Sequence, residues 1–140
     1  MKANVPVSTI MTKNVIKLNL GDDLTKAETL FKKNHIRHIP VVSGNKILGM
    51  LSYTDLLRIS FADAVDEEEM EVDVTVYNMF TIEQVMTRNL VTISPDSSIK
   101  EVAEILAVKE FHALPVVQDE LLVGIVTTTD LIKYLLKQYN

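Results

Sequence analysis

The amino-acid sequence predicts a mixed α/β (α+β) protein made of two β-α-β-β-α repeats related by pseudo-two-fold symmetry. The first observation behind this prediction is an internal duplication: Met11-Thr12-Lys13-Asn14 returns as Met86-Thr87-Arg88-Asn89, 75 residues later. The register holds without a gap over 48 positions, from Met11 to Arg58, with ten identities. The second observation is that both copies show the same succession of apolar runs and turns. A repeat of about 50 residues leaves apolar strands open on one face, so we expect the two repeats to pack together.

Each repeat is expected to begin with a short strand, Val15–Leu18 in the first copy and Leu90–Ile93 in the second. Turn and N-cap residues follow each strand. Apolar residues at helical spacing then predict an amphipathic helix, formed around Leu24, Ala27, Leu30 and Phe31 in the first copy and Ile99, Val102, Ala103 and Leu106 in the second.

The remaining elements of each repeat are a hairpin and a second helix. Two buried strands are predicted at Ile39–Val42 and Leu114–Val117. Each contains a proline near its start, where the backbone need not donate a hydrogen bond to a neighbouring strand. Polar turns lead to the strands Ile47–Leu51 and Leu121–Val126. The second helices are then capped by Ser52 or Thr54 in the first copy, and by Thr127 or Thr129 in the second.

The repeats place the expected boundaries at residues 1–60 and 81–140, with an acidic insert at 61–80. The insert holds seven acidic residues and no basic one. We expect a solvated linker there. The alternation of Val72, Val74 and Val76 with polar residues leaves an edge strand or interface arm as the alternative.

Composition excludes several classes of function. The 140-residue chain has no Cys, which removes disulfides, thiolate zinc sites and cysteine nucleophiles and fits a reducing compartment. Four scattered glycines form neither a G-x-G-x-x-G nor a G-x-x-x-x-G-K loop. The net charge of −5 disfavours nucleic acid as a partner. No apolar run approaches the ~18 residues of a membrane span. We therefore expect a cytoplasmic protein with no nucleic-acid or membrane partner.

Catalytic and metal-binding constellations are also weak. No set of nucleophile, base and orienting group is evident, so the chain is not expected to be an enzyme. His35 and His38 lack a third ligand nearby, and no metal site is predicted. Lys32, Lys33 and Arg37 form a small basic patch that lacks the aromatic partners of an RNA-binding surface.

The starts of the two second helices carry the strongest chemical signal. Asp55 follows Ser52 and Thr54, and Asp130 follows Thr127 and Thr129. A carboxylate there offers two acceptors to a vicinal diol, and hydroxyls and N–H groups at a helix N-terminus favour a phosphate. Simple helix capping is the alternative, because Ser, Thr and Asp are common at helix starts.

The duplicated pattern resembles a tandem pair of CBS domains (cystathionine-β-synthase domains), together called a Bateman module. The resemblance rests on the Met-Thr pairs and on two further motifs in each copy: His35-Ile-Arg-His-Ile-Pro-Val-Val42 and Gly49-Met-Leu-Ser-Tyr-Thr-Asp55, then Phe111-His-Ala-Leu-Pro-Val-Val117 and Gly124-Ile-Val-Thr-Thr-Thr-Asp130. It covers about Pro6 to Tyr134, and on this basis we expect no appended enzyme or channel domain.

The resemblance implies that adenine nucleotides or adenosine derivatives (AMP, ADP, ATP or S-adenosylmethionine) bind in clefts between the repeats, with no obligatory cofactor. The G-h-h-[ST]-x-x-D motif would contact ribose and phosphate. In one implied cleft Asp130, Thr127 and Thr129 face Ile16, Lys17, Arg37, His38 and Pro40. In the other, Asp55, Ser52 and Thr54 face Val91, Thr92, His112 and Pro115.

The two implied clefts differ in charge. Arg37-His38 aligns with His112-Ala113, so only the cleft around Asp130 contains a permanent cation from this segment. We hypothesise that it holds the tighter or more highly phosphorylated ligand. A solvated surface role for Arg37 is the alternative.

The sequence therefore predicts a regulatory nucleotide-binding module that transmits occupancy by conformation or association. Family resemblance implies a homodimer formed through helices, and a separate effector protein as the receiver of the signal. One alternative is a ligand-free structural or interaction module that dimerises or docks on a partner protein. Another is a small enzyme or RNA binder that uses the basic patch near Arg37.

Overall fold

The computed structural model describes residues 4–63, 77–109 and 111–139. The chain divides into two compact units, each built from segments of both repeats. The central unit is Ile16–Asn89, and the terminal unit combines Met1–Val15 with Leu90–Asn140. The chain therefore passes from one unit to the other twice, whereas the expected boundaries at 1–60, 61–80 and 81–140 follow the sequence repeats.

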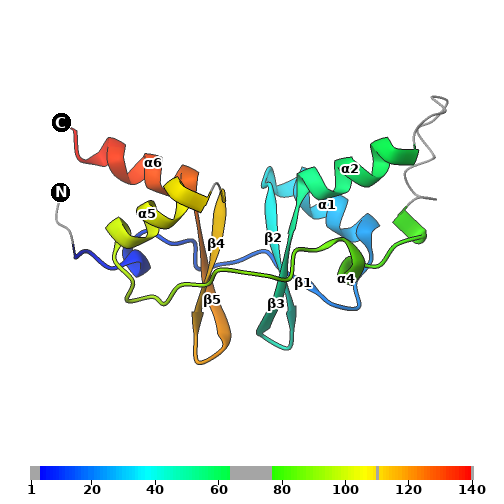
Figure 1. Ribbon diagram of the computed structural model, residues 1–140, viewed down its shortest axis with the longest axis horizontal. Helices are drawn as coiled ribbons and strands as arrows, with labels where there is room; N and C mark the ends of the chain where they lie inside the picture. Colours follow the sequence, from blue (N-terminus) through cyan, green and yellow to red (C-terminus); the bar gives the residue numbers. More distant parts are fainter. Residues whose placement is uncertain (1–3, 64–76, 110, 140) are drawn as a thin grey trace. The chain divides into compact units, whose positions relative to one another are not determined.

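The central unit is a small sheet with helices packed on it (Figure 1). Strand β1 (Leu18–Asn19) pairs parallel with β2 (His38–Ser43), which pairs antiparallel with β3 (Lys46–Ser52). Its helices are α1 (Leu24–Asn34), α2 (Tyr53–Asp63) and α4 (Ile82–Val85). The core is formed by Leu18, Leu24, Ala27, Phe31, Ile39, Val41, Leu51, Leu56, Tyr77, Ile82 and Met86.

The terminal unit repeats this arrangement around the hairpin of β4 (Ala113–Gln118) and β5 (Leu121–Thr127). Helix α5 (Ile99–Lys109) precedes the hairpin, α6 (Thr128–Lys137) follows it, and the short 3-10 helix η1 (Val7–Thr9) joins from the chain start. Its core contains Val7, Ile93, Val102, Leu106, Leu114, Val116 and Val126. The predicted mixed α+β fold is thus confirmed, since each repeat supplies a helix, a hairpin and a second helix.

The predicted helices and hairpins lie where the sequence places them. The apolar positions predicted to face inward on the first helices are buried at Leu24, Ala27 and Phe31, and again at Ile99, Val102 and Leu106. Leu30 and Ala103 are half-buried. Hydrophobic spacing identified these faces because local periodicity decides which side of a helix is apolar.

The predicted first strands are much shorter in the structure. Only Leu18 and Asn19 form strand β1, and in the second copy only Ile93 pairs, as an isolated bridge to Val116. The physical reason is that the residues before them carry the chain between units, at Val15–Ile16 and at Asn89–Leu90. An extended apolar run is therefore used here as a connection and pairs with a strand only at its end.

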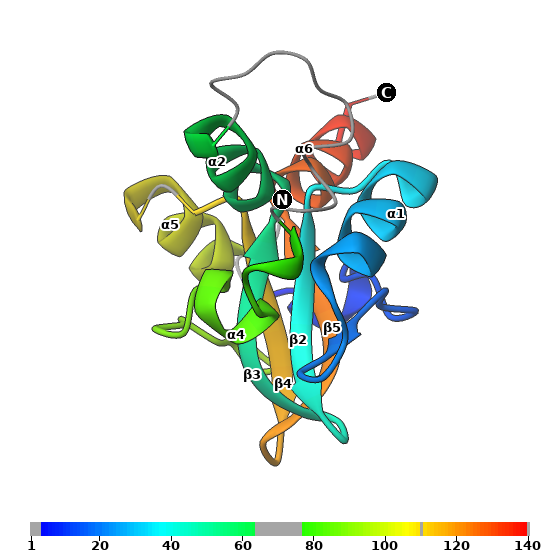
Figure 2. The same cartoon turned by 90° about the vertical axis from the view of Figure 1, so that its right-hand side faces the viewer.

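The segment before each Met-Thr pair folds onto the hairpin of the other repeat. The Thr12 and Ile125 backbones exchange two hydrogen bonds, at 2.8 and 3.0 Å, and Thr87 exchanges two with Met50, at 2.9 and 3.0 Å. Helix α4, which precedes Thr87, lies against β3 (Figure 2). The two repeats are therefore joined by an exchange of their N-terminal segments.

The acidic insert at 61–80 is described only at its two ends. The expectation of a solvated linker or an edge strand falls largely on residues 64–76, which lie outside the described residues. Before them, α2 extends to Asp63. After them, Tyr77 is 3% exposed in the core of the central unit, and its hydroxyl donates to the carboxylate of Glu28 at 3.1 Å. The end of the insert is thus part of the central unit's core.

Candidate functional site

The two predicted helix starts have the same local structure. The backbone N–H of Ser52 donates to Asp55 Oδ2 at 3.0 Å, and the N–H of Asp55 donates to Ser52 Oγ at 3.1 Å. In the second repeat the corresponding distances between Thr127 and Asp130 are 2.9 and 3.2 Å. Each pair is a reciprocal cap that satisfies N–H groups at the start of a helix. Ser52 and Thr127 are therefore the caps.

The other hydroxyls of the motif stay available to solvent. Thr54 and Thr129 lie in the first turns of α2 and α6 and are exposed, whereas the capping residues and both aspartates are half-buried. Each helix start thus presents an exposed threonine hydroxyl beside a half-buried carboxylate. Hydroxyls and a carboxylate at a helix N-terminus suit a ligand with both a diol and a phosphate.

The segment before each strand proline lies beside the helix start of its own repeat. The carbonyl of Arg37 accepts a hydrogen bond from the N–H of Tyr53 at 2.9 Å, and His38 is paired with Ser52. In the second repeat the carbonyl of His112 accepts from the N–H of Thr128 at 3.0 Å. The structure therefore gathers predicted site residues within each unit: Arg37, His38, Ser52, Thr54 and Asp55 in the central unit, and His112, Thr127, Thr129 and Asp130 in the terminal unit.

The implied clefts combine residues from both units, and this grouping stays a prediction. Arg37 is exposed, and its guanidinium makes no hydrogen bond or ion pair with the described part of the chain. His38 is half-buried and His112 is exposed.

The remaining predicted site residues lie around the first-strand segments. Ile16 packs on the core of the central unit, and Val91 packs on that of the terminal unit. Thr92 is exposed, and Pro40 and Pro115 are buried in β2 and β4. The two prolines are therefore shielded from solvent, whereas the Thr92 side chain is open to it.

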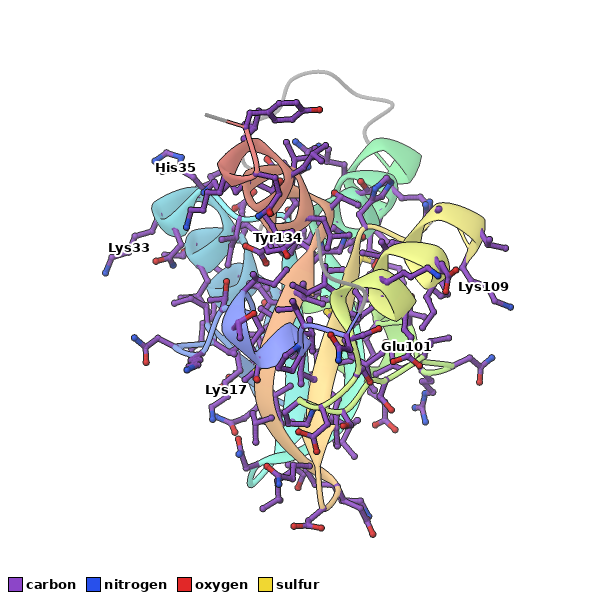
Figure 3. All side chains as sticks on the ribbon, turned by 90° about the vertical axis from the view of Figure 1, so that its left-hand side faces the viewer. Lys17, Lys33, His35, Glu101, Lys109 and Tyr134 are labelled. Carbon is purple, nitrogen blue, oxygen red and sulfur yellow. The ribbon has the colours of Figure 1, made fainter. Side chains whose placement is uncertain are left out.

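Lys17 is directed to the turn between β2 and β3. Its Nζ donates to Asn45 Oδ1 at 2.7 Å, at the end of the hairpin opposite to Ser52. Figure 3 shows Lys17 well separated from Lys33 and His35, which lie at the C-terminal end of α1. The cations of the central unit therefore do not form one patch.

One difference between the two helix starts was missed by sequence comparison. Arg58 Nη1 lies 3.2 Å from Asp55 Oδ1, so Asp55 uses both carboxylate oxygens in bonds within the chain. Lys133 stands at the equivalent position and forms no ion pair with the described residues. Sequence alignment treats Arg58 and Lys133 as a conservative match, although the Asp-x-x-Arg spacing on a helix was a signal for this pair.

Two further features bear on the excluded functions. In the described ranges, no group of three His, Asp or Glu side chains is placed to hold a metal ion. His35 ends α1 in a left-handed conformation, with φ of 53°, while His38 lies in β2.

None of the helices within residues 4–63, 77–109 and 111–139 has the length and apolar character to cross a bilayer.

The chain belongs to the CBS domain family, whose sequence profile matches residues 7–62 and 82–137. It is 28% identical over 132 residues to protein MJ1225 of Methanocaldococcus jannaschii, which has no assigned function; that alignment covers 94% of this chain and 47% of the relative. The chain thus spans about half the length of this relative. The crystal structure of MJ1225 superposes with a TM-score of 0.80 at 26% identity, covering 96% of this chain and 49% of that one.

Two solved structures that contain ligands are also similar. The CBS domain pair of protein MJ0100, in complex with 5′-methylthioadenosine and S-adenosylmethionine, has a TM-score of 0.77 at 27% identity and covers 94% of this chain and 99% of that one. CBSX2 in complex with AMP has a TM-score of 0.80 at 20% identity, with 97% and 99% covered. The second of these supports the fold alone.

Proposed function

We propose that this chain is a regulatory module that binds adenine nucleotides or adenosine derivatives and transmits their occupancy by conformation or association. The observation that carries the proposal is the pair of matched helix starts, Ser52 with Asp55 and Thr127 with Asp130, in a chain of the CBS family. Support also comes from the MJ0100 domain pair, whose ligands both contain adenosine. The candidates are AMP, ADP, ATP and S-adenosylmethionine.

The chemistry of the proposal rests on what each helix start offers. A carboxylate oxygen has two lone pairs, so Asp55 and Asp130 can accept from a ribose hydroxyl while they keep their backbone bonds. The exposed hydroxyls of Thr54 and Thr129 lie at the positive ends of α2 and α6, which favours a phosphate. Arg37 adds a permanent cation, which favours a ligand that carries a phosphate.

Transmission requires that the ligand bind one conformation or assembly better than another. We infer that the output passes through a homodimer or a separate effector protein. Helix α6 supports this inference, because Ile132, Leu135 and Leu136 are exposed at the spacing of one helical face. A response to the ratio of AMP to ATP would make the module an energy sensor. The same apolar face favours the second candidate function, a ligand-free interaction module.

Thermal unfolding with AMP, ADP, ATP and S-adenosylmethionine tests the proposal. A ligand at 100 times its Kd stabilises the native state by roughly 2.7 kcal/mol, which corresponds to a rise in Tm on the order of 5–10 °C at this chain length. The variants are Asp55→Asn and Asp130→Asn, which keep an oxygen acceptor for the cap. Asp23→Asn is the control, because Asp23 also caps a helix: it is the N-cap of α1 and accepts from Lys26 N–H at 2.8 Å.

We expect at least one ligand to stabilise the wild type and Asp23→Asn, and one site variant to lose that shift. If none of the four ligands raises the Tm of the wild-type chain, the nucleotide-binding function is wrong and the interaction module takes its place.

A further inference from the structure

The two helix starts match in caps and burial but differ in the state of the aspartate. Asp55 Oδ2 accepts from Ser52 N–H and Oδ1 accepts from the Arg58 guanidinium, so both oxygens are engaged. At Asp130, Oδ2 accepts both the N–H and the hydroxyl of Thr127. Its Oδ1 accepts no hydrogen bond from any residue that the structure describes. Only the second repeat thus presents an open carboxylate oxygen.

We propose that Arg58 is an internal competitor for Asp55, so that the two repeats are unequal and the Asp130 site binds adenosine more tightly. This inference rests on the proposed function. A vicinal diol donates two hydrogen bonds, and at Asp130 one of them reaches an unused oxygen. At Asp55 the diol must either share Oδ1 with the Arg58 guanidinium or displace that guanidinium.

The size of the effect follows from the exposure of the pair. The Arg58 side chain is 70% exposed and the Asp55 side chain 14% exposed, so solvent screens the ion pair. A ligand can therefore displace Arg58 from Asp55 at a small cost in free energy. Exposed ion pairs of this kind correspond to a factor of about two to five in a binding constant. Arg58 therefore lowers the affinity of the Asp55 site for adenosine but does not prevent binding there, so the Asp130 site is occupied first.

The equivalent residues Arg58 and Lys133 allow a reciprocal pair of substitutions. Lys133 occupies the place of Arg58 on α6 and forms no ion pair with the described residues. A lysine has a single flexible ammonium group, whereas arginine presents a planar fork of donors that matches a carboxylate. Arg58→Lys thus gives the first repeat the pattern of the second, and Lys133→Arg does the reverse.

Isothermal titration with adenosine tests the inference, because adenosine has no phosphate and leaves Arg37 without a role. The titrations use two backgrounds of the full chain: Asp130→Asn, which leaves the Asp55 site, and Asp55→Asn, which leaves the Asp130 site. We expect Arg58→Lys to tighten adenosine binding about two- to fivefold in the first background. We expect Lys133→Arg to weaken it by a similar factor in the second.

Two controls separate competition from a structural effect. Lys137→Arg adds the same side chain elsewhere on α6 and leaves both affinities unchanged. With 2′,3′-dideoxyadenosine, which has no diol, the effects of both exchanges disappear.

Each alternative result overturns the inference in its own way. Adenosine binding that is insensitive to both exchanges overturns the competition and leaves the proposed function standing. Weaker AMP binding in Arg58→Lys, with adenosine binding unchanged, makes Arg58 a phosphate ligand instead. If adenosine, AMP, ADP, ATP and S-adenosylmethionine all fail to bind the wild-type chain, the proposed function is wrong, and this inference with it.

Discussion

Met11 of the first repeat lies directly over Gly124 of the second. A Cβ added at Gly124 would be 2.7 Å from Met11 Sδ and 3.0 Å from the Thr12 carbonyl oxygen. The duplicated pair shows the same relationship: a Cβ at Gly49 would meet Met86 Sδ and would lie 2.9 Å from the Thr87 carbonyl oxygen. The Met-Thr motif and the glycine motif are therefore two sides of one packing contact, made between segments of different repeats.

This contact predicts that neither glycine tolerates a methyl group. Gly49→Ala and Gly124→Ala should each destabilise the protein by about 1–3 kcal/mol, because a backbone oxygen cannot move aside as a flexible side chain does. Chemical denaturation with a linear fit to denaturant concentration measures the free energy of unfolding. Gly21→Ala is the control, since no atom lies within 4 Å of a Cβ there. Equal stability of all three variants would contradict the packing explanation.

Arg37 should act on phosphate and not on adenosine. Its exposed guanidinium has no partner in the described part of the chain, so Arg37→Ala leaves the fold intact. We expect AMP affinity to fall about tenfold at one of the two sites, with adenosine affinity unchanged.

Isothermal titration with both ligands measures this difference. Lys33→Ala, which removes an exposed cation near the end of α1, is the matched control. Equal loss of AMP affinity at both sites would show that Arg37 does not distinguish them.

Glu101 should make stability depend on pH. The backbone N–H of Ser98 donates to the Glu101 carboxylate at 2.9 Å, and this bond, with that to the Ser98 hydroxyl, lowers the pKa of Glu101 from its ordinary value of 4.5. Because the folded state lowers this pKa, the contribution to stability is present above pH 4.5 and is lost as pH falls through the lowered pKa.

Thermal unfolding from pH 7 to pH 3 measures this contribution. Glu101→Gln keeps an oxygen acceptor for the Ser98 N–H but does not titrate, so its stability should fall less steeply below pH 4.5 than that of the wild type. Identical slopes would mean that Glu101 titrates alike in the folded and unfolded chains.

The turn between β4 and β5 is strained. Asp119 and Glu120 have φ of 55° and 69°, in the left-handed region that side chains disfavour. Two positive φ values in a two-residue hairpin turn favour Asp-Gly or Asn-Gly. Because glycine adopts a positive φ without strain, Asp119→Gly should stabilise the protein by about 0.5–1 kcal/mol in chemical denaturation. Asn45→Gly, in the other hairpin turn at a residue without positive φ, should give no gain; a gain there of equal size would refute the strain argument.

Helix α6 should mediate association. Its face of Ile132, Leu135 and Leu136 is between 42% and 63% exposed. In a symmetric dimer, Leu136→Glu would place a charge from each protomer in the interface, and we expect the dimer Kd to rise at least about tenfold. Analytical ultracentrifugation measures this constant. Val108→Glu, at a 75% exposed position on α5, should leave it unchanged. A wild-type chain that stays monomeric at all concentrations would exclude this interface.

Local patterns in the sequence determined most of the elements of each repeat. The apolar spacing of Leu24, Ala27 and Phe31 defined a helix face, and the proline and glycine motifs bounded the hairpins, because periodicity and turn chemistry act over a few residues. The duplication strengthened each assignment, since two copies had to agree. The helix starts at Asp55 and Asp130 were found in the same way, as short motifs whose caps form within four residues.

Tertiary structure decided the long-range pairings. Thr12 bonds to Ile125 and Thr87 to Met50, so the segments before the Met-Thr pairs fold with the opposite repeats, and the expected strands Val15–Leu18 and Leu90–Ile93 become largely connections. Which backbone groups pair between segments far apart in the sequence depends on the packing of whole elements, and no local propensity encodes it. For the same reason, Arg58 and Lys133 looked equivalent in the aligned repeats, whereas the described structure places only Arg58 against its aspartate.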